Sequence, residues 1–258
     1  MECGMRDELQ YQPLLDEIVK GSLRILGANL TGIYLHGSMA MGCFQPDRSD
    51  IDLIFVVKGN ITDGQKLLFM NRVVEWNGQA PEKGLELSVV KEEYCRSFLY
   101  PTPYELHFSN THLQWFHDDP ADYVSRMRGT DRDLAAHFTI IRKYGIVLYG
   151  EPVDALFGQV PEEDYLDSIR YDVEGAKEEV AKNPVYVILN LCRAAAFVRD
   201  REILSKKQGG EWALENLDAC LGPLISGALG CYGEGSAFRP KEEEAQNFCD
   251  IMLRMIFP

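Results

Sequence analysis

The sequence has no apolar run of the roughly 18 residues that a membrane-spanning helix needs. Its first ten residues, MECGMRDELQ, are acidic and lack the apolar core of a secretory signal. The seven cysteines include no C-x-x-C pair, and their odd number and irregular spacing favour neither a disulfide framework nor a zinc site. We therefore expect a cytoplasmic protein with no membrane association.

Positive charge is scarce, because the 26 lysines and arginines are outnumbered by 40 acidic residues, which gives a net charge of −14. Proteins that bind a nucleic-acid backbone normally present a basic surface. We therefore expect no nucleic-acid partner, which argues against polymerase-like functions. An acidic protein suits a small polycationic partner, although excess acid by itself is more often explained by solubility.

The most informative stretch is YLHGSMAMGCFQPDRSDIDLIFVV, residues 34–57. The apolar run at 32–35 predicts a strand, and the β-branched and aromatic run at 53–57 predicts a second, buried strand. Side chains of a strand alternate with a period of two. Asp50 and Asp52 are therefore expected on the same face, a few ångströms apart.

Two close carboxylates repel each other unless a cation lies between them. Hard divalent cations such as Mg²⁺ prefer oxygen ligands and commonly bind carboxylates together with substrate phosphates. Gly37 and Ser38 predict a tight turn that offers a backbone N–H and a hydroxyl to phosphate oxygens. Each pattern alone is commonly a solvated strand end or an ordinary turn, but their combination favours a functional site.

The remaining periodicity predicts an α+β protein with two domains. Residues 1–157 alternate helical and strand patterns, whereas residues 158–258 carry helical patterns alone, punctuated by prolines. We expect an N-terminal α/β domain with a mixed sheet and a C-terminal all-α domain. The expected N-terminal elements are helices at 14–26, 65–76 and 131–145 and strands at 85–90, 104–108 and 146–149. The expected C-terminal helices lie at 162–182, 185–198, 211–217, 221–229 and 241–257. In helix 65–76 the expected apolar stripe is Leu67, Leu68, Met70, Val73 and Val74.

The Gly-Ser pair, the short spacer and the Asp-x-Asp that opens an apolar strand resemble the nucleotidyltransferase superfamily. That family transfers a nucleoside monophosphate from a nucleoside triphosphate to an acceptor hydroxyl with Mg²⁺. Its pattern includes a third carboxylate on a following strand, and Glu86 in LELSVV is the candidate. Such a carboxylate can bind metal or accept the proton of the acceptor hydroxyl.

Nearly the whole chain resembles the spectinomycin/streptomycin group of aminoglycoside nucleotidyltransferases, the 9-/3''-adenylyltransferases. The matching segments are LTGIYLHGSMAMGCF, SDIDLIFVV, LELSVV, YELHF, TDRDLAAHFTIIRKYGIVLYG, NPVYVILNLCR and ILSKKQGGEWAL. The resemblance implies O-adenylylation of an aminocyclitol or aminoglycoside antibiotic by ATP, with release of pyrophosphate and resistance as the result. We expect a monomer whose partners are small molecules.

The resemblance also implies roles for individual residues. Asp50 and Asp52 would hold two Mg²⁺ ions, and Glu86 would be the catalytic base, a further metal ligand and an acceptor contact. Cations from the helical domain would balance the triphosphate charge. The implied nucleotide contacts are Ser38, Ser49, Asp133, Arg193, Lys206 and Tyr232.

Substrate choice depends on two departures from the family pattern. Thr111 stands where members that modify both drugs have a tryptophan, and Trp115 comes four residues later. Glu179 and Asn183 lie in the region of the acidic acceptor contacts. We expect spectinomycin as the favoured acceptor and streptomycin as a poorer one. The alternatives are a nucleotidyltransferase for another hydroxylated metabolite or a protein, or an inactive nucleotide-binding module.

Overall fold

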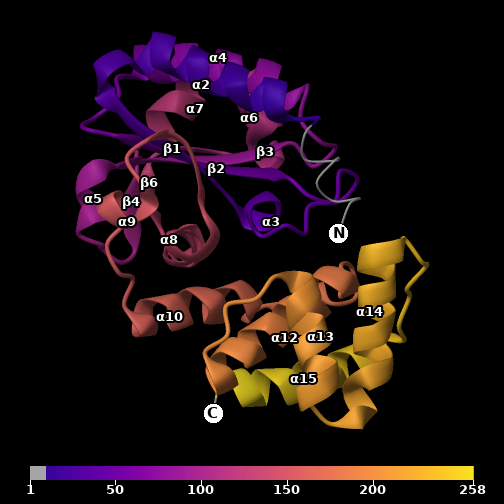
Figure 1. Cartoon of the computed structure of the whole chain (residues 1–258). Coiled ribbons are helices and arrows are strands. Elements are labelled where there is room, and N and C mark those ends of the chain that lie inside the picture. The colour runs from indigo at the N-terminus through magenta and orange to yellow at the C-terminus, as the bar shows by residue number, and fades with distance from the viewer. Residues whose placement is uncertain (1–9, 258) are drawn as a thin grey trace. The chain divides into compact units, whose positions relative to one another are not determined.

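The computed structural model describes residues 10–257, so most of the acidic N-terminal segment, Cys3 included, lies outside the described part (Figure 1). The chain divides into two compact units, Met1–Pro161 and Glu162–Pro258. The domain limits expected from the sequence, 1–157 and 158–258, stay a prediction. Each unit is described by itself below.

The N-terminal unit is built on a mixed five-stranded sheet, as the sequence predicts. Its strand order is β5-β3-β2-β1-β7, with β2 and β3 parallel and the other neighbours antiparallel. The strands are β1 Leu30–His36, β2 Ile51–Val57, β3 Leu85–Lys91, β5 Leu106–Phe108 and β7 Ile146–Gly150. A second, two-stranded sheet pairs β4 Thr102–Tyr104 with β6 Gly129–Asp131.

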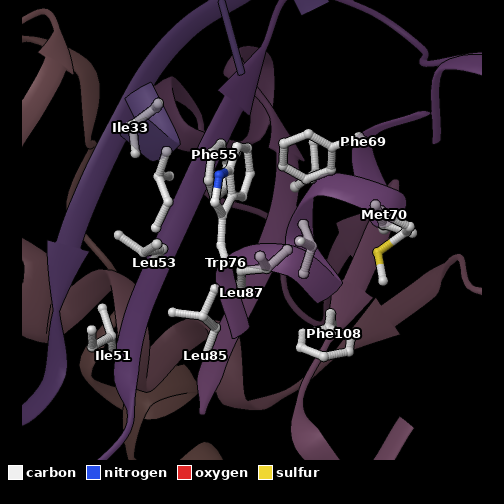
Figure 2. Packing of buried hydrophobic residues seen from close by; sticks show 14 of the residues in the cluster. Ile33, Ile51, Leu53, Phe55, Phe69, Met70, Trp76, Leu85, Leu87 and Phe108 are labelled. Atoms are coloured by element: carbon white, nitrogen blue, oxygen red, sulfur yellow. The ribbon is translucent and has the colours of Figure 1, made fainter. Parts of the chain in front are cut away.

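The central strands are buried on both faces, which explains their nearly continuous apolar sequence. One face packs against helices α2 Gln12–Leu26 and α4 Asp63–Asn77; Leu53 and Phe55 lie there with Trp76 of α4 (Figures 1 and 2). The opposite face carries Tyr34, Ile54 and Val90, which pack against helix α8 Asp133–Tyr144. The unit is therefore layered, with helices on both sides of the sheet.

Helix α4 confirms the predicted helix and part of its buried stripe, since Met70 and Val73 are buried as expected. The capping box of Thr62 and Gln65 fixes its start at Asp63. The buried face consists of Lys66, Phe69, Met70, Val73 and Trp76, a helical repeat of three and four residues. Figure 2 shows Phe69, Met70 and Trp76 of this face. Leu68 was expected in the stripe and is 61% exposed, because the two large aromatic rings take the sheet-facing side.

The predicted strand at 104–108 is divided. Its first part, β4, belongs to the small sheet, and its second part, β5, pairs with β3. The chain changes sheets at Glu105, whose carboxylate lies 3.5 Å from Lys91 Nζ. The other N-terminal elements are η1 Gly27–Asn29, α3 Gly37–Ala40, α5 Glu92–Arg96, η2 Asn110–His112, α6 Leu113–Asp118, α7 Pro120–Arg126 and α9 Val153–Leu156.

Described residues from Glu162 onward form helices and no strand, as predicted. The helices are α10 Glu162–Val173, α11 Ala176–Glu179, α12 Pro184–Asp200, α13 Lys206–Asn216, η3 Ala219–Leu221, α14 Gly222–Glu234 and α15 Glu242–Ile256. Helix α12 is central, because most of its residues are buried in the core of the unit. The helix predicted at 162–182 breaks at Glu174 and Gly175, and α13 begins before the predicted residue 211 because Ser205 and Gln208 form a capping box. Within residues 10–257, no helix is long and apolar enough to cross a membrane.

The two faces of α4 give a prediction for stability. Trp76→Ala removes a fully buried indole, so it should lower the free energy of unfolding by about 3–5 kcal/mol. Leu68→Ala, on the exposed side of the same helix, should change it by less than about 0.5 kcal/mol. Urea unfolding followed by circular dichroism measures both. Similar losses for the two variants would contradict the observed orientation of α4.

Candidate active site

The candidate site lies at the end of the central strands, on the α8 side of the sheet. In register, His36 of β1 pairs with Asp52 of β2, and Asp52 pairs with Glu86 of β3. Asp50 immediately precedes β2 and so points the same way as Asp52. Carboxylate oxygens of Asp50, Asp52 and Glu86 all lie within 4.8 Å of one another, and each residue is half-buried. The strand register thus brings together the three carboxylates that the sequence singles out.

Gly37 allows this arrangement because it occupies the space beside Asp52. Its φ of +62° is in the left-handed region, and a Cβ there would collide with the Asp52 carboxylate. The expected tight turn at Gly37 and Ser38 is instead the start of the one-turn helix α3. The close approach of backbone and carboxylate explains why glycine stands at this position.

The two serines expected at the triphosphate differ in their surroundings. The Ser38 hydroxyl is buried and has no hydrogen-bond partner among the described residues. Buried hydroxyls are normally paired, so a ligand atom is the natural partner. Ser49 is also buried, and its Oγ accepts the backbone N–H of Gln45 at 3.1 Å. Ser49 therefore closes the loop before Asp50 and retains its own O–H for donation.

The charge around Glu86 favours a bound cation. Burial raises the pKa of the Glu86 carboxyl, and the charges of Asp50, Asp133 and Asp131 raise it further, against an opposing effect of His137. Neighbouring like charges disfavour an ionised carboxylate unless a proton or a cation neutralises it. The donors are three carboxylates beside an unsatisfied hydroxyl, a set of hard oxygens that fits Mg²⁺.

Two histidines beside the site were not anticipated from the sequence. His137 of α8 has its ring centroid 4.8 Å from that of His36, and its Nδ1 is buried with no partner in the described part of the chain. Burial lowers the pKa of His36, and His137 lowers it further, so His36 is neutral at pH 7. Asp133 lies one helical turn before His137, at the start of α8. That i, i+4 spacing was the available signal, but a predicted helix does not show which element it packs against.

In the helical unit, Arg193 and Lys206 belong to one connected group. Arg193 of α12 lies 3.5 Å from the Asp172 carboxylate. Lys206, in the first turn of α13, has its ammonium 5.0 Å from the centroid of the Tyr186 ring, and the Tyr186 hydroxyl donates to Asp172 at 3.0 Å. Tyr232 lies on α14, half-buried against the core of the unit.

The helical unit also contains a cavity of about 240 Å³, whose lining includes Asp172, Glu179, Tyr186 and Asn190. Glu179 ends α11 and lies 3.9 Å from Lys182 Nζ. The Oδ1 atom of Asn190 is buried and has no partner among the described residues. The cavity therefore offers acceptors to a ligand that donates hydrogen bonds. Asn183 precedes α12 as its N-cap.

Thr111 and Trp115 lie on the short helical segments after β5. The Thr111 hydroxyl is 2.8 Å from Ser109 Oγ. Trp115 donates from Nε1 to Asp122 at 2.9 Å, and Arg126 lies over its ring at 5.4 Å. Trp115 therefore has partners within its own unit, and Thr111 offers no aromatic surface.

The sheet, the paired carboxylates and the glycine-serine helix define a nucleotidyltransferase. Residues 15–107 match the nucleotidyltransferase domain family, and residues 155–255 match the aminoglycoside adenylyltransferase C-terminal domain family. The chain is therefore similar to aminoglycoside adenylyltransferases in both of its units.

Relatives align with almost the whole chain. An aminoglycoside (3'') (9) adenylyltransferase of Klebsiella pneumoniae is 25% identical over 91% of this chain and 90% of its own length. A spectinomycin 9-adenylyltransferase of Campylobacter jejuni is 20% identical over 96% of both. The crystal structure of spectinomycin adenyltransferase AAD(9) from Enterococcus faecialis, solved with ATP and spectinomycin, has a TM-score of 0.82 at 18% identity and covers 95% of this chain and 99% of its own. That likeness shows a shared fold.

The carboxylate cluster gives a second prediction. Asp50→Asn or Asp52→Asn removes a charged oxygen ligand, so Mg²⁺-dependent activity should fall by about 10²–10³-fold, the scale on which loss of one electrostatic stabiliser acts. The melting temperature should stay the same or rise, because repulsion within the cluster is relieved. Asp47→Asn, an exposed change of equal charge in the same loop, is the control. Full Mg²⁺-dependent turnover in both site variants would contradict the assignment.

Proposed function

We propose that the protein transfers AMP from ATP to a hydroxyl of an aminocyclitol antibiotic, releases pyrophosphate and thereby confers resistance. Spectinomycin is the favoured acceptor and streptomycin the poorer one. The observation that carries this proposal is the convergence of Asp50, Asp52 and Glu86 beside the unsatisfied Ser38 hydroxyl. The proposal is supported by the names of the relatives and by the ATP and spectinomycin bound to the Enterococcus enzyme.

Asp50 and Asp52, with an oxygen of Glu86, would hold Mg²⁺. When bound, the metal would neutralise phosphate charge and polarise phosphate oxygens. Ser38 and Ser49 would donate their hydroxyl hydrogens to the triphosphate. Glu86 would accept the proton of the attacking acceptor hydroxyl, and the raised pKa of this carboxyl makes it a stronger base.

The triphosphate also needs positive partners, which three carboxylates do not supply. Arg193 and Lys206 would bind its phosphates, and their shared network with Asp172 supports a joint role. Asp133 and Tyr232 would contact the rest of the nucleotide, as the family resemblance implies.

The acceptor would be recognised by its amines. Glu179 and Asn190 line the cavity of the helical unit, and their side-chain oxygens would accept hydrogen bonds from the ligand. Glu86 and Asn183 would add contacts to the same class of donors. A cationic aminocyclitol suits these acceptors and the net charge of −14.

The protein would be a cytoplasmic monomer. It would have no nucleic-acid partner, because its net negative charge opposes binding to a phosphate backbone.

The direct test is pyrophosphate release from MgATP with a panel of acceptors. Spectinomycin should support turnover, and the panel should include streptomycin and other aminoglycosides. Turnover with none of them, from protein that binds MgATP, would move the assignment to another acceptor or to an inactive nucleotide-binding module.

Glu86→Gln separates proton transfer from nucleotide binding. If Glu86 is chiefly the base, transfer should fall by roughly 10²-fold or more while MgATP affinity is retained. Isothermal titration calorimetry measures the affinity, and Glu82→Gln, an exposed change of the same charge, is the control. A loss of MgATP binding equal to the loss of rate would identify Glu86 as a metal ligand instead.

Thr111 gives a prediction about substrate choice. An aromatic face attracts guanidinium groups by roughly 0.5–2 kcal/mol, and streptomycin carries such groups. Without that face, kcat/KM for streptomycin should fall below that for spectinomycin by about 2- to 30-fold. Thr111→Trp should narrow the difference. Equal use of both drugs by the unmodified protein would show that Thr111 does not decide selectivity.

A further inference from the structure

The carboxylate of Asp172 interacts with hydrogen-bond donors along one face of helix α12. It accepts the hydroxyl of Tyr186 at 3.0 Å and Nδ2 of Asn190 at 3.1 Å, and it pairs with Arg193 at 3.5 Å. These residues stand at i, i+4 and i+7, so they lie on one face of the helix. Asp172 lies near the end of α10, and its side chain is only 27% exposed.

Arg193 and Tyr186 both stay protonated at pH 7, so each can donate a hydrogen bond. Burial by itself would lower the pKa of the Arg193 guanidinium, but Asp172 and the hydroxyls of Tyr186 and Tyr165 raise it above its ordinary value. Burial and Asp172 raise the pKa of Tyr186 to about 12, so its hydroxyl keeps its proton at pH 7. Arg193 still has 30% of its side chain exposed and can contact a ligand.

Lys206 joins the same group through the ring of Tyr186, over which its ammonium lies. The capping box of Ser205 and Gln208 fixes the start of α13 and so places Lys206 in its first turn. Gly209 then lets α13 approach α12 closely, since a Cβ there would lie 2.8 Å from Arg193 Cβ and 2.9 Å from its Cα. The two cations are therefore linked by packing as well as by Asp172.

We propose that Asp172 is a positioning residue, which fixes Arg193 directly and Lys206 through the Tyr186 ring so that both cations are arranged before the triphosphate arrives. This inference rests on the proposed function, which assigns these cations to the phosphates. Long cationic side chains lose rotamer freedom on binding, and prior ordering reduces that loss. Asp172 also offsets part of the charge of Arg193, which by itself would weaken phosphate binding, so ordering and charge compensation change the Kd in opposite directions.

The test is MgATP affinity without acceptor, measured by isothermal titration calorimetry. Asp172→Asn should raise the Kd about tenfold, the scale of one charged hydrogen bond, and Asp172→Glu should restore most of the loss. Glu174→Gln makes the same charge change at a neighbouring exposed position and should leave the Kd within about twofold. Unchanged or tighter binding by Asp172→Asn would overturn the inference.

A double-mutant cycle separates positioning from general stability. In an Arg193→Met background, Asp172→Asn should raise the Kd by only about threefold instead of about tenfold, because only the ordering of Lys206 through Tyr186 remains to be lost. An equal loss in both backgrounds would show a merely structural role. If Arg193→Met alone leaves MgATP binding intact, the inference fails, whereas turnover of spectinomycin by the unmodified protein would leave the proposed function standing.

Tyr186→Phe tests the network with little disturbance of the core. It keeps the ring beneath Lys206 and removes the hydroxyl that bonds to Asp172, so the Kd for MgATP should rise about threefold. The melting temperature of each variant shows whether it is folded. If folded Tyr186→Phe protein binds MgATP with an unchanged Kd, the inference that Asp172 orders Lys206 is wrong.

Discussion

The structure of the N-terminal unit depends on holding three mutually repelling carboxylates together. Asp50, Asp52 and Glu86 place oxygens within 4.8 Å of one another, a cluster that would spread apart on a mobile scaffold. Strands β2 and β3 prevent this, because their parallel register fixes Asp52 opposite Glu86 and their apolar residues are buried on both faces of the sheet. Burial of the core therefore offsets a local electrostatic cost, as is common where a site is prepared for a cation.

The pairing of β2 with its other neighbour, β1, determines which residues surround the carboxylate cluster. Because β1 places His36 beside Asp52, the chain turns into α3 where only glycine fits next to that carboxylate, and Ser38 follows with its unsatisfied hydroxyl. Helix α8 closes this face of the sheet and brings Asp133 and His137 to it. The pairings of β2 with β3 and with β1, together with the packing of α8, thus fix the positions of the carboxylates, the hydroxyl and the neighbouring imidazoles.

The parts of this arrangement that follow from local periodicity could be predicted from the sequence. A period of two placed Asp50 and Asp52 on one face, and the same period separated Glu86 from the core residues Leu85 and Leu87. The buried face of α4 was predicted only in part: Met70 and Val73 are buried as expected, but Leu68 is exposed and Trp76 is buried, because the sequence does not state which side of the helix meets the sheet. The network of Asp172 was missed for a related reason: Asp172 and Arg193 meet only through the packing of α10 on α12.

The carboxylate cluster of the N-terminal unit and Asp172 of the helical unit differ in the number of hydrogen-bond donors around them. That difference decides whether a carboxylate needs a cation or orients other side chains. Oxygens of the carboxylate cluster lie within 4.8 Å of one another, and burial and the charges of Asp50, Asp133 and Asp131 raise the pKa of Glu86 against an opposing effect of His137, so the cluster favours a bound cation. Asp172 is instead shared by a hydroxyl, an amide and a guanidinium, so its charge is already compensated and it serves to orient its donors. In the proposed function, the carboxylate cluster would hold the metal and Asp172 would order the cations that bind phosphates.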